Sequence, residues 1–156
     1  MGREVTGEWI GAYSYDPPIV RPSVSFRLRL TQSWLGRFSG VVLDGEGGMP
    51  EEGRVGGWLR GNRLSFKKQM PVFRVFDGGQ TLPLSEYAAA KGWTVEPDTP
   101  HPPIRYEGVL SDDLQVVEGR WRTEACAVRL VGQLAALPFP ACAGIWKAER
   151  HQSLIG

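Results

Sequence analysis

The feature that most constrains the fold is a recurring alternation of apolar and polar residues along short stretches of the chain. In the segment 24–30, Val24 and Phe26 alternate with polar residues and are followed by Leu28 and Leu30 in the same phase. This period of two predicts a half-buried strand. One short helix is predicted over 84–91, where alanines and Glu86 favour helix and Gly92 ends it. The same alternation predicts eight strands in all, over 7–15, 24–30, 36–44, 54–60, 63–70, 104–110, 114–123 and 144–150.

Long and short connections alternate between these strands, and the longest is the insertion from Pro71 to Pro103. In an antiparallel meander the odd-numbered connections lie at one end, so all the long ones meet there. Eight strands without a covering helix avoid exposed edges most simply by closing on themselves. We therefore predict an all-β chain, 1–156, that forms one domain: an eight-stranded antiparallel up-and-down barrel with one long insertion between strands five and six. A two-sheet sandwich is the structural alternative.

The composition is consistent with a barrel, and the net charge argues against some classes of binding partner. The chain has 20 Gly and 12 Pro, which disfavour a helical bundle, and 42% hydrophobic residues, enough for a core. Glycines inside strands permit curvature, and the prolines are expected at the end with the long connections. The net charge of +1 without a basic block argues against nucleic acid and against an anionic membrane. Without a long apolar run or an apolar start, we expect a cytoplasmic protein.

Two predicted strands carry a resemblance to a known superfamily. Segment 7–15 reads GEWIGAYSY and segment 36–44 reads GRFSGVVLD, and the chain resembles the calycins, which comprise lipocalins, fatty-acid-binding proteins and avidins, with the avidin-like branch most similar. The resemblance implies that Trp9 packs against an Arg from the last strand at the closed end, and antiparallel pairing of the last strand with the first brings Arg150 to that level. The long insertion and the lack of the later tryptophans of avidins depart from the pattern, so biotin binding is not implied.

Side-chain parity predicts which residues face a ligand. If Trp9 points inward, alternate residues of each strand do so as well. We expect Leu28, Phe38, Leu64 and Leu110 to fill the lower lumen with Trp9, because an eight-stranded barrel holds little more than its own side chains or one small molecule. The upper lumen would combine apolar walls with a few polar groups, as ligand pockets do. The predicted ligand-binding residues are Tyr13, Tyr15, Asp44, Lys68, Met70, Tyr106, Trp121 and Thr123.

Several of these residues also have an ordinary structural interpretation. Asp44 precedes Gly45 and fits a turn, Lys68 fits a lysine that reaches for solvent at the rim, and the tyrosines fit barrel packing. His101, between prolines, is expected to be a solvated loop residue. We find no signature of a nucleophile, a metal site or a cofactor, and assign no catalytic residue and no metal ligand. Cys126 and Cys142, both in the last long connection, are expected to be free and buried.

The leading functional hypothesis is a non-catalytic protein that binds a small, partly apolar molecule in the upper lumen. The insertion, with Tyr87, Trp93 and His101, would gate the pocket. One alternative is an isomerase or hydratase in which His101 or Asp44 moves a proton. Another is a protein-interaction module with a filled barrel and an exposed Trp34. Barrels of this kind often pair along an outer sheet face, so a homodimer is a further expectation.

Overall fold

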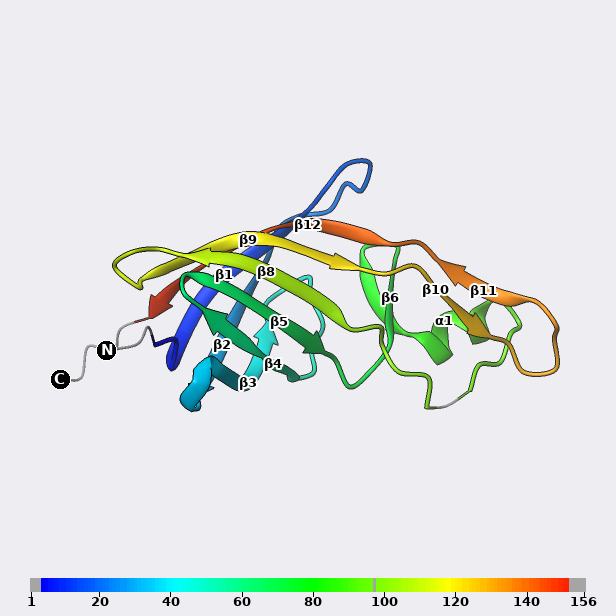
Figure 1. Ribbon diagram of the computed structural model, residues 1–156. Coiled ribbons are helices and arrows are strands. Elements are labelled where there is room, and N and C mark those ends of the chain that lie inside the picture. The colour runs from blue at the N-terminus through cyan, green and yellow to red at the C-terminus, as the bar shows by residue number, and fades with distance from the viewer. Residues whose placement is uncertain (1–3, 97, 152–156) are drawn as a thin grey trace.

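The computed structural model describes residues 4–96 and 98–151 and shows a closed, eight-stranded antiparallel barrel (Figure 1). The sandwich alternative is therefore wrong, and the predicted barrel is confirmed. Around the barrel the strands follow the order β1-β12-β9-β8-β5-β4-β3-β2. Their bounds are β1 Gly7–Tyr15, β2 Val24–Gln32, β3 Arg37–Asp44, β4 Gly53–Arg60, β5 Arg63–Gln69, β8 Ile104–Leu110, β9 Val116–Thr123 and β12 Cys142–His151.

The first and last strands close the barrel, and a Trp–Arg contact fixes the closed end. In this register Trp9 lies opposite Leu28 of β2 on one side and Arg150 of β12 on the other. The Arg150 guanidinium lies 4.5 Å from the centroid of the Trp9 ring, a cation–π contact. It also donates hydrogen bonds to the carbonyl oxygens of Thr6 and Leu114. The contact expected from the resemblance is thus present.

Side chains fill the lower lumen as the alternation predicts. Trp9, Leu28, Phe38, Leu64 and Leu110 are all buried in one core cluster. Higher up, aromatic rings from several strands meet, and the Phe66 and Tyr106 rings stack with centroids 4.7 Å apart. Above this packing, a cavity lies at the mouth.

Close approach of neighbouring strands requires glycine at specific inward positions. A Cβ on Gly57 of β4 would collide with the carbonyl oxygen of Ser65 in β5, whereas the neighbouring Gly56, on the outer face, has open space around it. Glycine therefore allows the tight curvature of the barrel here, as the sequence predicts.

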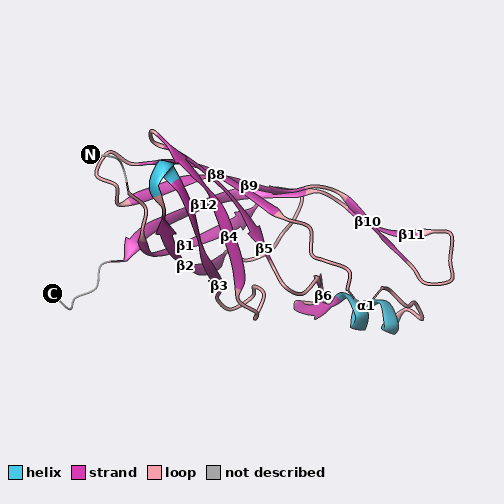
Figure 2. Ribbon diagram, turned by 60° about the horizontal axis from the view of Figure 1, so that its bottom comes forward, coloured by secondary structure: helices cyan, strands magenta, loops and turns pink. Residues whose placement is uncertain are grey.

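The long connections at the mouth contain secondary structure that the sequence analysis missed. The insertion folds into the hairpin of β6 (Arg74–Asp77) and β7 (Gln80–Pro83), followed by α1 (Leu84–Ala90), close to the predicted helix. Past the barrel the chain forms a second hairpin, β10 (Cys126–Arg129) with β11 (Ala136–Phe139). These elements extend the molecule away from the mouth (Figures 1 and 2). At the other end, the 3-10 turn Trp34–Gly36 joins β2 to β3.

The extension has a hydrophobic core of its own. Buried Phe73, Leu84, Ala88, Val95, Val128 and Leu130 form a cluster distinct from that of the barrel. Tyr87 and Trp93 pack against this second cluster. Neither residue lines the mouth cavity, and their expected role as a gate over the pocket stays a prediction.

The prolines follow the predicted asymmetry. Apart from Pro97, which lies outside the described residues, they occur in the long connections or in the strands β7 and β11 that those connections contain. The four long connections all join mouth ends of barrel strands, because Tyr15, Asp44, Gln69 and Thr123 end their strands at that level. Among the described residues, no helix is long and apolar enough to cross a membrane.

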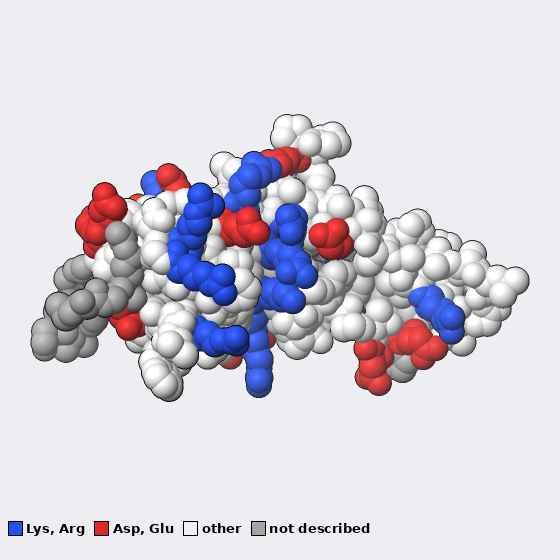
Figure 3. Space-filling view, viewed as in Figure 1, with Lys and Arg blue, Asp and Glu red and all other residues white. Residues whose placement is uncertain are grey.

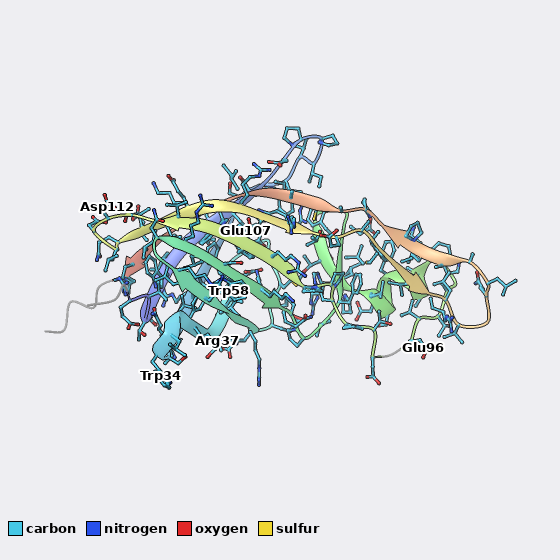
Figure 4. All side chains as sticks on the ribbon, in the orientation of Figure 1. Trp34, Arg37, Trp58, Glu96, Glu107 and Asp112 are labelled. Atoms are coloured by element: carbon cyan, nitrogen blue, oxygen red, sulfur yellow. The ribbon has the colours of Figure 1, made fainter. Side chains whose placement is uncertain are left out.

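Charged side chains cover the outer face of the barrel. Lys67, Arg105 and Arg122 are direct register neighbours across β5, β8 and β9, and all three are exposed. Lysine and arginine side chains accordingly gather on the face that Figure 3 shows. Trp34 lies at the closed end and is 85% exposed, as expected (Figure 4). None of these groups faces the lumen.

Candidate functional site

A cavity of about 170 Å³ lies at the mouth, between the aromatic layer of the barrel and the extension. Its lining brings together all but one of the predicted ligand-binding residues. The exception is Met70, which follows the end of β5, packs in the barrel core and lines a separate cavity under the insertion. The predicted residues that line the mouth cavity are Tyr13, Tyr15, Asp44, Lys68, Tyr106, Trp121 and Thr123.

The polar centre of the cavity is a buried ion pair between β3 and β5. Lys68 Nζ lies 2.8 Å from Asp44 Oδ1, and the two side chains are only 3% and 1% exposed. The other carboxylate oxygen, Oδ2, accepts a hydrogen bond from the Tyr13 hydroxyl at 3.2 Å and one from the Met49 N–H at 3.4 Å. Lys68 therefore does not reach for solvent at the rim, which corrects that interpretation. Asp44 does tie down a turn, as expected, and it also holds a buried cation.

Burial shifts the protonation equilibria of these groups. Burial lowers the pKa of Lys68, and the Asp44 carboxylate opposes this by favouring the ammonium. Burial also raises the pKa of Tyr13, and the negative charge of Asp44 adds to this. Tyr13 therefore stays protonated and acts as a hydrogen-bond donor to the carboxylate.

Aromatic rings form the walls. The Trp121 ring meets Tyr15 edge-on at a centroid distance of 5.1 Å, and its indole N–H donates to the Ser14 carbonyl at 2.9 Å. Tyr106 is buried, and no hydrogen bond within the described residues uses its hydroxyl. Burial raises the pKa of Tyr106, so this hydroxyl is also protonated. The walls are thus held by ring packing and a backbone hydrogen bond, and they include one buried hydroxyl with unused capacity.

His101 enters the cavity from the insertion, contrary to the expectation of a solvated loop residue. It is 8% exposed, and its ring packs on Phe73 with centroids 5.3 Å apart. Its Nδ1 lies 2.7 Å from the Pro102 carbonyl oxygen, which can only accept, so Nδ1 carries the proton and Nε2 has the free lone pair. Burial lowers the pKa of His101, and the nearby Lys68 charge adds to this. This burial could not be predicted, because a loop segment between prolines is typical of an exposed position.

Residues from the connections complete the rim. The Arg21 guanidinium stacks over the Phe76 and Tyr15 rings, at 3.7 and 4.6 Å from their centroids. Arg74 forms an ion pair with Glu51, with Nε 2.5 Å from Oε1. Sequence parity could not find these residues, because they lie outside the barrel strands. The other lining residues, which the predicted ligand-binding set does not include, are Arg21, Met49, Phe73, Arg74, His101, Pro102, Ile104, Glu124, Cys126, Phe139, Pro140 and Cys142.

The two cysteines line the same cavity as free thiols. Both are half-buried rather than buried, and they lie in β10 and β12 instead of a loop. The Thr123 hydroxyl lies 3.0 Å from Cys142 Sγ and accepts the Cys142 N–H at 3.1 Å. No cluster of three or more potential metal ligands occurs among residues 4–96 and 98–151.

Comparison of the chain with family models, with curated proteins and with solved structures gives no match. The closed eight-stranded barrel is compatible with a calycin-like fold.

Proposed function

We propose that this chain is a calycin-like, non-catalytic binding protein that holds one small, partly apolar molecule in the mouth cavity. One observation carries the proposal: the lumen is packed below but keeps a cavity at the mouth, with aromatic walls around buried polar groups. Apolar walls with a few placed polar groups are typical of small-molecule sites. The cytoplasmic location and the homodimer stay predictions.

The buried ion pair supports this proposal because burying two charges is energetically unfavourable. Removing a carboxylate and an ammonium from water costs several kcal/mol for each ion, and apolar residues of similar size often stabilise a core as well or better. The pair of Asp44 and Lys68 faces a cavity, so its groups are available to a ligand. A role in orienting the polar end of a ligand explains why such a pair stands at this place.

The two alternatives fit less well. A protein-interaction module needs a lumen filled to the mouth, which is at odds with the cavity. The isomerase or hydratase alternative is favoured by one observation, the neutral His101 at the wall of the same cavity. It stays the second candidate, with Nε2 of His101 as the proton acceptor.

Native mass spectrometry of the purified full chain tests the proposal by searching for a co-purifying small molecule. A screen of small aromatic compounds, followed through tryptophan fluorescence, then uses Tyr15→Phe and Asp44→Asn. We expect both variants to weaken binding, with Tyr87→Phe in the extension as the matched control that leaves binding unchanged. If nothing co-purifies and every variant binds the compounds like the parent chain, the mouth cavity is not a binding site.

A further inference from the structure

The Lys68 amine is unusual among the lysines of this chain. The others, Lys67, Lys91 and Lys147, are exposed, whereas Lys68 points from β5 into the lumen and lines the mouth cavity. Its neighbour Lys67 lies on the opposite face of the same strand. The chain thus carries one buried amine that an entering molecule would meet and three solvated amines for comparison.

The surroundings of Lys68 favour covalent chemistry with a carbonyl group. A lysine that is desolvated in an apolar pocket loses its proton more readily and becomes a nucleophile. Burial lowers the pKa of Lys68 in this way. The Asp44 carboxylate at 2.8 Å is placed to pair with a cation at the same nitrogen after reaction. The unprotonated Nε2 of His101 lines the same cavity and can accept the proton that the amine releases.

We propose that Lys68 forms a Schiff base with a small aromatic aldehyde held in the mouth cavity, an inference that rests on the proposed function. The carbonyl carbon forms a bond to Nζ, and its oxygen leaves as water. The protonated amine paired with Asp44 becomes a protonated imine paired with Asp44, so no net proton is gained or lost and no oxidant or reductant is needed.

The size and walls of the cavity select the aldehyde class. An apolar cavity of about 150 Å³ holds one benzene ring, and the mouth cavity measures about 170 Å³. The Trp121 and Tyr15 rings offer aromatic surface on one side, and the buried Tyr106 hydroxyl offers a donor with unused capacity. A one-ring aromatic aldehyde therefore fits better than a long-chain one.

Reductive trapping tests this inference on the intact chain. The protein is incubated with benzaldehyde and sodium cyanoborohydride, and fragment mass spectrometry locates the added benzyl groups. We expect Lys68 to be labelled at least about tenfold faster than the adjacent Lys67, the difference that 1.4 kcal/mol produces. Labelling in guanidinium chloride is the control, because the preference for Lys68 must vanish when the cavity is gone. Equal labelling of Lys67 and Lys68 in the native chain overturns the inference.

Benzyl alcohol separates this inference from the proposed function, because it matches benzaldehyde in shape and lacks the carbonyl. Excess benzyl alcohol is expected to change tryptophan fluorescence and to protect Lys68, but not Lys67, from labelling. If benzyl alcohol binds and Lys68 is never labelled, the Schiff base is refuted and the binding proposal stands. If neither compound binds and no small molecule co-purifies with the chain, both are refuted. Lys68→Arg, which keeps the cation beside Asp44, is expected to lose the fast labelling; if the fast label persists elsewhere in this variant, the assignment to Lys68 is wrong.

Discussion

The ion pair between Asp44 and Lys68 allows a quantitative test of the site. With side chains 1% and 3% exposed and the charged atoms 2.8 Å apart, each partner depends mainly on the other for charge compensation. Removing one partner of such a pair leaves an uncompensated buried charge and costs about 3–5 kcal/mol. For a chain of this length that corresponds to a fall in Tm of roughly 6–20 °C.

A double-mutant cycle measures this directly. Asp44→Asn keeps the shape of the side chain and can still accept the hydrogen bond from Tyr13, whereas Lys68→Met keeps an unbranched chain, one atom shorter, without the charge. We expect each single variant to lose about 3–5 kcal/mol of unfolding free energy in urea titrations. The double variant is expected to lose less than the two losses added together, with a coupling energy of about 2–3 kcal/mol.

The exposed pair of Arg29 and Glu8 provides the matched control. Its atoms lie 3.2 Å apart, but the side chains are 71% and 33% exposed. The same cycle on this pair should give less than about 1 kcal/mol. If the Asp44–Lys68 cycle gives an equally small coupling, the pair is hydrated in solution and the reasoning about a desolvated polar centre is wrong.

Three further predictions follow from other parts of the molecule. Because burial lowers the pKa of His101 in the folded chain, this histidine binds a proton at higher pH in the unfolded chain, so the free energy of unfolding should fall as the pH drops below about 6.5. The urea midpoint should therefore fall less between pH 7 and pH 5 in His101→Asn than in the parent chain. An equal fall in both would contradict the burial of His101. Gly57→Ala should cost at least about 1–3 kcal/mol because its Cβ meets the backbone of β5, while Gly56→Ala should cost nothing measurable; similar thermal midpoints for the two would refute the close approach. Arg150→Met should cost at least about 2 kcal/mol and change Trp9 fluorescence, since carbonyl oxygens at the closed end lose a charged donor; a variant as stable as the parent chain would show that this contact is dispensable.

Much of the barrel could be predicted because the alternation of apolar and polar side chains indicates which residues of each strand face the lumen. Once Trp9 is set inward, the same parity places Tyr13 and Asp44 inside, and the structure places both there. The alternation of long and short connections, together with the need to cover exposed strand edges, predicted the order of the strands. Local pattern and global fold agree in this part of the chain.

The pairing inside the site could not be predicted in the same way. Asp44 and Lys68 lie on β3 and β5, which are separated by β4, so their contact depends on the curvature of the closed sheet. The alternation of side chains predicts that both face inward, but it does not predict the distance between two side chains across the lumen. His101 was misjudged for a related reason, because its burial depends on Phe73 and the second hydrophobic cluster.

The two mouth hairpins were missed although one of them carries a recognisable signal. Asp77, Gly78, Gly79 and Gln80 form a tight turn in which both glycines have positive φ, a sequence typical of two-residue hairpin loops. Each flanking strand spans only four residues, too few for the alternation to register. The β10–β11 hairpin has no comparable glycine turn between closely spaced strands.

The separate core of the extension has a kinetic consequence. Phe73 and Phe139 belong to that second cluster and also line the mouth cavity. A small cluster can open locally while the hydrogen-bonded barrel stays intact, because the stability of a protein varies from one part to another. For the binding function proposed above, we expect the residence time of a bound molecule to depend on fluctuations of the extension and its affinity to depend on the barrel walls. Backbone amides of α1 and β10 should accordingly exchange with deuterium faster than those of β1 and β12.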